Sequence, residues 1–255
     1  MKRHHAACQR STRKSRNLTQ SRGVAPVARG VDFLPSMSRR IPLLLALALT
    51  ALSACSMQSK LIHRPTDASV DAAISAMWTS EIRRVARDGD WLLSRAYYAT
   101  SDLIVLGTTG ESLSHGSIYD ATRDTVIESI GSGVREIPLE QFVQRNHLVL
   151  VVRPSNMSAV DGQAAVARAR SKLGAPFDAT GMFGFDDPDK FYCTELVYWA
   201  SQTAARTGSH ERVVTPSDLM KYGEVIYWSG KRDDAQLGEI AADRRRTAAR
   251  TAASP

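Results

Sequence analysis

The apolar positions that follow residue 68 repeat with two different periods, and each period predicts a different kind of element. Between residues 69 and 87, apolar side chains recur at three- and four-residue spacing, at Val70, Ile74, Met77, Trp78, Ile82 and Val85. This spacing predicts an amphipathic helix, because it puts these side chains on one stripe. The turn residues at 88–90 end the helix, and the apolar residues 91–93 begin a short buried strand.

Further along the chain the apolar runs become short and rich in β-branched residues, which is typical of strands. Runs of this kind occupy residues 103–106, 117–119, 125–130, 148–153 and 225–228. Helices are predicted from Pro138 through Val143, over about 158–173, over 192–205 and, as a short turn, over 217–222. The order of these elements predicts an α+β fold in which helices pack on an antiparallel sheet.

The segment before this domain reads as a targeting signal. Two arginines at 39 and 40 precede an apolar run at 41–52, which is too short to span a bilayer, and small residues lead to Cys55. The stretch LSAC resembles the lipobox of bacterial lipoproteins. That resemblance implies that residues 37–54 are a lipoprotein signal peptide and that Cys55 is lipidated, with several acyl chains anchoring the protein in a membrane. The alternatives are a plain signal peptide or an uncleaved anchor helix.

The segments around the signal complete the predicted organisation. Residues 1–36 are rich in Arg and Ser and precede Met37, which indicates a disordered extension or a mis-called start. Residues 55–68 are polar and are expected to form a tether, residues 69–229 the folded domain, and residues 230–255 a disordered tail. A Ser at position 56 resembles lipoproteins sorted to the outer membrane, which implies an attachment at its periplasmic face in the cell envelope.

The charge of the chain lies mainly in its N-terminal part. The net charge is +7, but the first 54 residues hold 10 of the 33 Lys and Arg residues and one of the 26 acidic ones. The rest of the chain is therefore slightly acidic, and composition gives no argument for binding nucleic acid. The three cysteines, Cys8, Cys55 and Cys193, are too few for a disulfide framework. If Cys55 carries lipid, Cys193 is a lone thiol in an exported protein.

Cys193 and His115 are the candidate nucleophile and base. Cys193 lies at the start of the helix predicted over 192–205, where unpaired N–H groups and the helix dipole favour the thiolate. Asp186, Asp187 and Asp189 precede it and are candidates to cap that helix. His115 lies where a loop enters the strand at 117–119, and its imidazole could exchange a proton with the thiol. The alternatives are a buried inert cysteine and a structural histidine.

Glu128 is the candidate third residue of the site. If residues 117–119 and 125–130 form a hairpin, the second strand runs back beside His115, and a carboxylate there could orient the imidazole. The alternation of side chains in the strand does not decide which face Glu128 takes. His147, at the start of the next strand, is an alternative, whereas Asp90 in a turn is expected to be structural.

Five patches of the sequence together resemble one family of enzymes. They are GDWLLSR, LSHGSIYD with VIES after it, KLGAPFD, FYCTELVYWA and TPSDLMKYGEVIYW, spread over about residues 89–228. These patches resemble the permuted NlpC-type papain-like cysteine hydrolases of the YiiX/YaeF type. In that family the histidine precedes the cysteine, as His115 precedes Cys193. The resemblance implies a circularly permuted papain-like fold, with Cys193 as nucleophile, His115 as base and Glu128 as the orienting group.

The resemblance also implies a cell-envelope hydrolase that cleaves an amide through a thioester on Cys193. A small peptide or cell-wall peptide is the expected substrate. The alternatives are an acyltransferase or lipid or ester hydrolase like the lecithin:retinol acyltransferases, or a catalytically silent lipoprotein. No cofactor and no metal is expected, because the sequence holds no Cys/His cluster with ligand spacing. The sequence does not name the substrate, since loops that fold analogy does not predict build the binding groove.

Overall fold

A computed structural model describes residues 57–108, 112–185 and 187–252 of the chain. The chain divides into two compact units, residues 1–43 and 44–255, and the described residues all belong to the second. The predictions for residues 1–36, for the signal peptide at 37–54 and for Cys55 therefore lie outside the described residues. Asp186 lies outside them as well.

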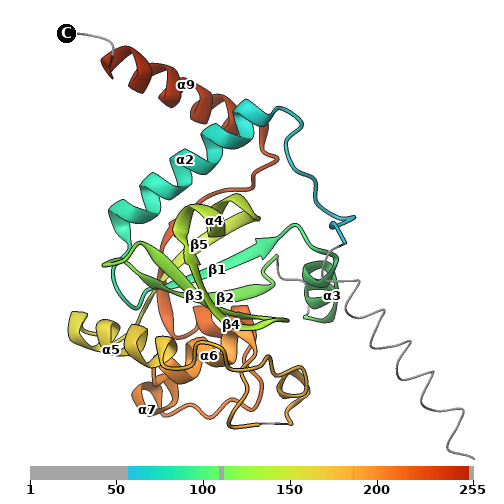
Figure 1. Cartoon of the computed structure of the whole chain (residues 1–255), viewed down its shortest axis with the longest axis vertical. Helices are drawn as coiled ribbons and strands as arrows, with labels where there is room; N and C mark the ends of the chain where they lie inside the picture. Colours follow the sequence, from blue (N-terminus) through green and yellow to red (C-terminus); the bar gives the residue numbers. More distant parts are fainter. Residues whose placement is uncertain (1–56, 109–111, 186, 253–255) are drawn as a thin grey trace, which may run out of the picture. The chain divides into compact units, whose positions relative to one another are not determined.

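The centre of the described part is a six-stranded antiparallel sheet with the strand order β4-β3-β2-β1-β5-β6 (Figure 1). Its strands are β1 (Trp91–Ala96), β2 (His115–Asp120), β3 (Thr125–Ile130), β4 (Gly133–Pro138), β5 (Asn146–Pro154) and β6 (Gly223–Trp228). Central strand β1 pairs with both β2 and β5, and all six of its residues are buried. A central strand buried on both faces reads as a continuous apolar run, as residues 91–93 do.

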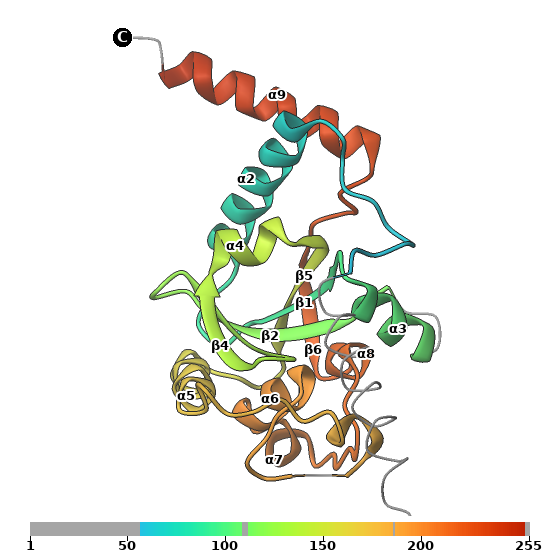
Figure 2. The ribbon, with the colours of Figure 1, turned by 45° about the vertical axis from the view of Figure 1, so that its right-hand side comes forward.

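Helices cover both faces of the sheet (Figures 1 and 2). One face carries α2 (Ala68–Val85), α4 (Leu139–Gln144) and α9 (Ala235–Ala252), and the other α5 (Ala159–Arg170), α6 (Cys193–Ala200), α7 (Thr203–Thr207) and α8 (Pro216–Met220). Two apolar cores result, because successive strand residues point to opposite faces. Leu92 and Val126 belong to the core under α2, and Leu93 and Ile127 to the core under α6.

The predicted α+β architecture is confirmed, and so are several of its elements. The helix predicted over 69–87 is α2, which the Asp67 side chain caps by accepting the backbone N–H groups of Ser69 and Val70. The strands predicted over 117–119 and 125–130 form the hairpin β2–β3, with Ile118 paired to Ile127. The predicted helix over 192–205 is divided into α6 and α7, because Gln202 adopts a left-handed backbone with φ 51°.

Two interpretations of the sequence are wrong. Residues 103–106 lie in the helix α3 (Ala99–Gly107), not in a strand, and none of the four is buried. Residues 235–252 of the predicted disordered tail form α9, which packs against α2. Two small residues explain that packing, since Gly238 and Ala241 are buried and a Cβ added to Gly238 would lie 3.1 Å from a Val70 methyl carbon. Strand β4 has no counterpart in the predictions.

Candidate active site

Cys193 is the first residue of α6, at the helix end that faces β2 and β3. The residue before it, Tyr192, is the N-cap, and its backbone N–H donates to Glu195 Oε2 at 3.0 Å. The Tyr192 hydroxyl accepts the N–H of Val214 at 2.8 Å, and Ser129 donates to the Phe191 carbonyl. These bonds fix the turn that carries the thiol. The prediction that Asp187 or Asp189 caps the helix is wrong, because Tyr192 occupies the cap.

His115 is the first residue of β2, directly opposite Ser94 of β1. The next residue, Gly116, lets α6 come close to the strand. A Cβ at Gly116 would lie 2.8 Å from Thr194 Cγ2 and 3.3 Å from Leu219 Cδ1, so any larger residue would push α6 away. The backbone N–H of Gly116 also donates to the Cys193 sulfur. This close approach is what brings a helix residue and a strand residue 78 positions apart into one site.

The side chains of Cys193, His115 and Glu128 form a hydrogen-bonded row. The thiol bonds to the imidazole of His115, and His115 Nε2 lies 2.8 Å from Glu128 Oε2. Because Glu128 occupies Nε2, the other ring nitrogen, Nδ1, is left for the sulfur. Exposure falls along the row, from the partly exposed Cys193 to His115 with 12% of its side chain exposed and Glu128 with none. The Glu128 carboxylate is therefore the most deeply buried group of the row.

Glu128 is held by two arginines in addition to the histidine. Arg135 Nε donates to Glu128 Oε1 at 2.9 Å, and Arg145 Nη2 donates to Oε2, the oxygen that also faces His115. Burial alone would raise the pKa of this carboxyl. The hydrogen bond from His115 and the charges of His115, Arg145 and Arg135 outweigh burial and lower the pKa to about 2. Glu128 is therefore a permanent anion behind the imidazole.

The same contacts shift the pKa values of the histidine and the cysteine in opposite directions. Burial lowers the pKa of His115, but its bonds to Cys193 and Glu128 and their charges raise it to about 9. Burial raises the pKa of Cys193, but the bond to His115, the imidazolium charge and the N–H groups of Gly116 and Thr194 lower it below its ordinary value. Both shifts favour the thiolate and imidazolium form of the pair, which is the reactive form of a cysteine nucleophile.

The structure brings together all three of the catalytic candidates from the sequence. It also places the alternatives: the ring of His147 is buried with Nδ1 3.4 Å from the Tyr97 hydroxyl and Nε2 3.5 Å from Asp233. Asp90 accepts the N–H of Arg87 and the guanidinium of Arg153, so it is structural as expected.

Sequence reasoning missed the two arginines that hold Glu128. Arg135 lies directly opposite Glu128 in the ladder between β3 and β4, so a prediction of β4 would have found it. Arg145 follows α4 as its C-cap, with its guanidinium carbon 5.2 Å from the centre of the Phe142 ring. Nothing in the spacing of the sequence pairs Arg145 with Glu128, because their contact depends on how α4 packs on the sheet.

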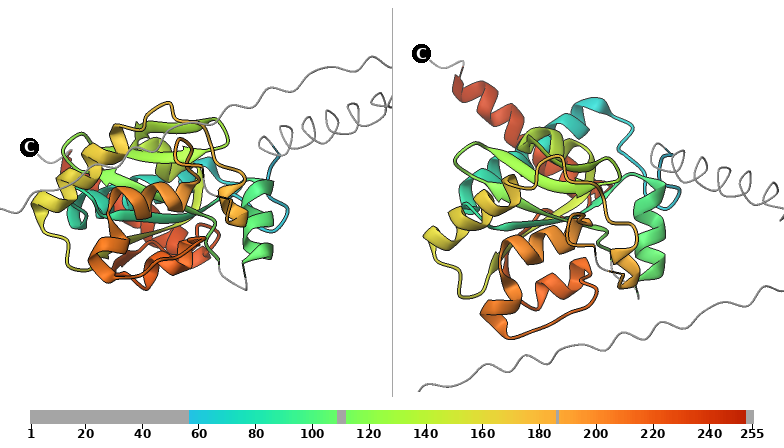
Figure 3. Two further views of the ribbon diagram at one scale, coloured as in Figure 1. Left: turned by 90° about the horizontal axis from the view of Figure 1, so that it is seen from below. Right: turned by 60° about the horizontal axis from the view of Figure 1, so that its bottom comes forward.

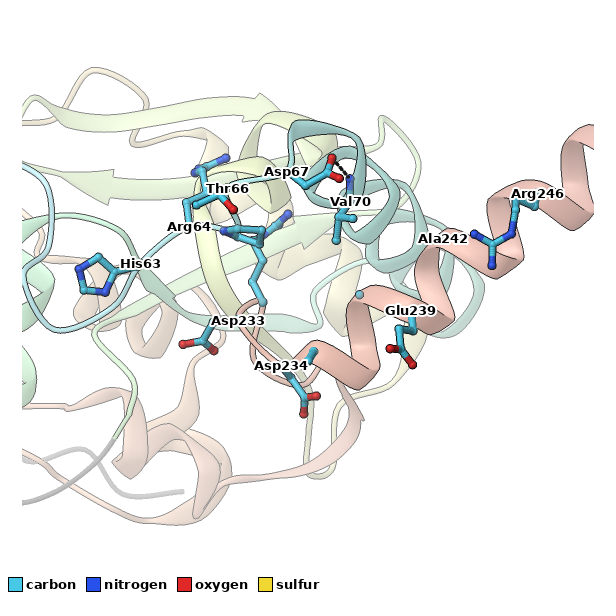
Figure 4. A pocket seen from close by; sticks show the side chains of 14 residues that line it. His63, Arg64, Thr66, Asp67, Val70, Asp233, Asp234, Glu239, Ala242 and Arg246 are labelled. Atoms are coloured by element: carbon cyan, nitrogen blue, oxygen red, sulfur yellow. Dashed lines mark hydrogen bonds between the residues drawn. The ribbon is translucent and has the colours of Figure 1, made fainter.

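A separate hollow of about 590 Å³ lies between residues 63–67 and the first turns of α9 (Figure 4). None of the three catalytic candidates lines it. Two of its charged groups have partners of their own, since Asp67 caps α2 and Arg64 pairs with Asp71 at 2.9 Å. Within residues 57–108, 112–185 and 187–252, no cluster of three or more His, Cys, Asp or Glu could hold a metal ion.

Comparison with known proteins finds one family whose model matches the sequence. The family described as permuted papain-like amidase enzymes, YaeF/YiiX, C92 family, matches residues 85–221, which is more than half of the chain. The matched range runs from the end of α2 to the end of α8. It includes the three residues of the row, the two arginines that hold Glu128, and Gly116. No curated protein matches the sequence.

Proposed function

Because the chain belongs to the C92 family of permuted papain-like amidases, which are cysteine hydrolases, we propose that it cleaves an amide through a thioester on Cys193. His115 acts as the acid and base of the reaction, and Glu128 orients and charges the imidazole. One observation carries the proposal: the sulfur of Cys193, the imidazole of His115 and the carboxylate of Glu128 are hydrogen-bonded in series. This is the arrangement in which an activated nucleophile, its base and an orienting anion work together.

The reaction proceeds in two half-reactions. The Cys193 thiolate attacks the amide carbonyl and forms a C–S bond, and the backbone N–H groups at the start of α6 stabilise the oxyanion. The C–N bond breaks as the imidazolium of His115 gives its proton to the leaving amine. Water then attacks the thioester while His115 takes a proton from it. The C–S bond breaks, the acid leaves, and thiolate and imidazolium are restored.

The decisive experiment is labelling with a thiol-directed acyl probe at neutral pH. We expect rapid labelling of the wild type, none of Cys193→Ala, and labelling slowed at least tenfold in His115→Ala. His210→Ala serves as the matched control, because His210 is an exposed histidine outside the row. Equal labelling of wild type and His115→Ala would break the proposed pair.

The substrate is proposed to be a small peptide or cell-wall peptide of the cell envelope. The alternative, an acyltransferase or lipid or ester hydrolase of the lecithin:retinol acyltransferase type, uses the same thioester. Incubation with muropeptides, short-chain thioesters and phospholipids, each beside Cys193→Ala, distinguishes the two. Release of an amine from muropeptides supports the amidase, and consumption of thioester or phospholipid alone supports the alternative. A chain that labels but consumes none of them contradicts both.

The proposed location is the periplasmic face of the outer membrane, through acyl chains on Cys55. Its support is the order of basic, apolar and small residues over 37–55 and the serine at 56. Intact mass of the protein from membranes tests this proposal. We expect a chain that begins at Cys55 and carries acyl groups. A chain that retains residues 37–54, or that begins at Cys55 without lipid, would contradict it.

A further inference from the structure

Helix α3 carries an apolar run that packs in neither core of the sheet. Residues 103–106 read LIVL, and none of the four side chains is buried. Leu103 is 64% exposed and Leu106 72% exposed, although the helix as a whole is strongly apolar. Helices normally turn their apolar residues toward the interior. An exposed apolar run of this kind marks a surface that meets another apolar phase.

This helix is bound firmly to the first described residues of the chain. The N–H of Ala99 donates to the Met57 carbonyl at 2.9 Å, and Gln58 forms a β-bridge with Tyr98. The buried carboxylate of Asp102 accepts the Ser59 hydroxyl at 2.8 Å. Figure 1 shows the start of the coloured chain beside α3.

The same carboxylate makes two more bonds. It accepts the backbone N–H of Lys60 at 3.0 Å and pairs with the guanidinium of Arg95, at the end of β1, at 2.7 Å. Residues 57–60 and α3 therefore move as one piece with the sheet. Residues 57–60 belong to the segment expected to form a tether, but they are fixed to α3, and together with Leu61 we call them the strap.

The strap adds apolar side chains next to those of the helix. Met57 is 49% exposed and Leu61 is 55% exposed. We call Met57, Leu61, Leu103 and Leu106 the α3 surface. These four large apolar side chains come from two segments that hydrogen bonds hold together.

The position of Cys55 decides what covers this surface. Two residues of chain span at most about 7 Å, so the Cα atom of Cys55 lies within that reach of the Cα atom of Met57. If Cys55 carries acyl chains, its backbone lies at the membrane interface, and the fixed strap brings α3 there as well. Amphipathic segments at an interface bury their apolar side about 5–10 Å into the boundary between headgroups and acyl chains. That depth suits single leucine side chains.

We infer that the α3 surface docks on the phospholipid bilayer that holds the lipid anchor. The inference rests on the proposed acylation of Cys55. Docking makes α3 a second, non-covalent attachment beside the lipid anchor. The anchor places the domain at the membrane, and α3 fixes its orientation there. The helix lies on the membrane and does not cross it, since no helix among the described residues is long and apolar enough for that.

Docking through α3 also orients the active site. Tyr98, the N-cap of α3, is four residues from Ser94, which pairs with His115. The N–H of Tyr97 lies 3.4 Å from the carbonyl of Arg145, one of the two arginines on Glu128. The end of the sheet that carries the catalytic row is therefore the end that α3 holds toward the bilayer.

Photo-crosslinking tests the inference. Benzoylphenylalanine replaces Leu106 in one variant and Val160 in the matched control, which is also apolar, helical and 74% exposed. Val160 lies in α5, on the side of the domain away from α3 (Figures 2 and 3). The full protein, purified from membranes, is reconstituted in vesicles of phosphatidylethanolamine and phosphatidylglycerol and irradiated, and phospholipid adducts are quantified by mass spectrometry.

We expect at least tenfold more phospholipid adduct at position 106 than at position 160. Equal adducts at the two positions, or crosslinks from position 106 to a second copy of the chain, would overturn the inference. Intact mass of the same sample separates this failure from failure of the anchor. Acylated protein without adduct at 106 overturns docking alone, unacylated protein with adduct overturns the anchor alone, and unacylated protein without adduct overturns both.

Discussion

Glu128 and Arg135 face each other directly across strands β3 and β4, and the guanidinium Nε of Arg135 donates to Glu128 Oε1 at 2.9 Å. The other carboxylate oxygen is shared by His115 and Arg145. Three positive groups thus surround one buried carboxylate. The carboxylate has no access to water, so the arginines provide the stabilisation of the anion that hydration would otherwise give. The charge of Glu128 therefore depends on two arginines in addition to His115.

The two arginines should differ in their effect on stability. The side chain of Arg145 is 14% exposed and that of Arg135 is 37% exposed, so solvent screens the second more. We expect Arg145→Gln to lower the free energy of unfolding by about 1–3 kcal/mol, and Arg135→Gln by about 1 kcal/mol or less. Urea unfolding at pH 7 measures both. An equal loss of unfolding free energy in the two variants would contradict the expectation that Arg145 contributes more.

The pH dependence of stability should follow from the low pKa of Glu128. A carboxyl whose folded-state pKa is about 2, against 4.5 when unperturbed, stabilises the fold fully above pH 4.5. That contribution is lost as the pH falls from 4.5 toward 2. We expect the difference in unfolding free energy between wild type and Arg145→Gln to shrink over this window. A difference that stays constant down to pH 2 would mean that Glu128 is not the group that Arg145 stabilises.

Removing the charge of Glu128 should slow the reaction without abolishing it. Glu128→Gln keeps the shape of the side chain but no longer stabilises the imidazolium of His115, whose pKa then falls. We expect kcat/KM for probe acylation to fall by about 10- to 100-fold, which is about 1.4–2.7 kcal/mol of transition-state stabilisation. Glu136→Gln is the matched control, because Glu136 on β4 pairs with Arg170 outside the row. A similar loss in both variants would argue for a general effect on the sheet.

The thiol should react at a pH where an ordinary thiol does not. The pKa of His115 is raised to about 9 and the pKa of Cys193 is lowered, so the thiolate forms at a lower pH than in an ordinary thiol. We expect the rate of alkylation by iodoacetamide to reach half of its maximum well below pH 9. In His115→Ala the midpoint should move upward, because burial then raises the thiol pKa against only the N–H groups of Gly116 and Thr194. Each unit of that shift lowers the rate at pH 7 about tenfold.

The same titration has a consequence for folding stability. A histidine whose pKa is raised from 6.5 to about 9 stabilises the fold fully below pH 6.5 and loses that effect as the pH rises through about 9. His115→Ala should therefore lose more stability at pH 6 than at pH 10. Unfolding curves at the two pH values measure this difference. A larger loss at pH 10 would mean that the imidazole is neutral in the folded protein.

A methyl group at Gly116 should separate the two halves of the site. The added Cβ would lie 2.8 Å from Thr194 Cγ2, so α6 must move away from β2 and the sulfur from the imidazole. We expect Gly116→Ala to slow probe acylation at least tenfold, since small displacements of catalytic groups have large effects. Gly107→Ala is the control, because a Cβ there meets no atom within 4 Å. Unchanged acylation by Gly116→Ala would show that the close approach is not needed.

The catalytic candidates were accessible to sequence reasoning because local chemistry marks them. Cys193 stands at a helix start and His115 at a strand start, and the β2–β3 hairpin that carries Glu128 follows from two β-branched runs with a turn between them. The face of Glu128 was not accessible. Its burial depends on Arg135 and Arg145, which compensate the charge of the carboxylate.

The wrong interpretations have a shared physical cause. The run LIVL at 103–106 looks like a strand because sequence patterns treat apolar residues as buried, whereas α3 exposes them. Residues 230–255 look like a tail because Arg and Ala dominate them, whereas α9 packs through Gly238 and Ala241. In both segments a contact outside the segment decides the structure, and single-sequence patterns do not contain it.

The region after β6 leads to the last prediction, because one arginine in it is fully buried. The side chain of Arg232 has no exposed surface, and its guanidinium carbon lies 4.5 Å from the centre of the Trp78 ring. It donates to the carbonyls of Asn146 and Val143 and to the carboxylate of Asp71, the last at 2.9 Å. Arg232 thereby joins β5, α4 and α2.

We expect the loss of Arg232 to cost more than the loss of the helix that follows it. Arg232→Met removes a buried guanidinium that donates to Asp71 and to the carbonyls of Asn146 and Val143, and leaves Asp71 with Arg64 as its remaining charged partner. This should lower the free energy of unfolding by about 3 kcal/mol or more. A stop codon in place of Ala235 removes α9, which packs through the buried Gly238 and Ala241 and the partly buried Leu237, and should cost about 1–2 kcal/mol. Urea unfolding compares the two, with thiol labelling of Cys193 to verify the fold. If the truncation cost more than Arg232→Met, α9 and not the arginine would complete the domain.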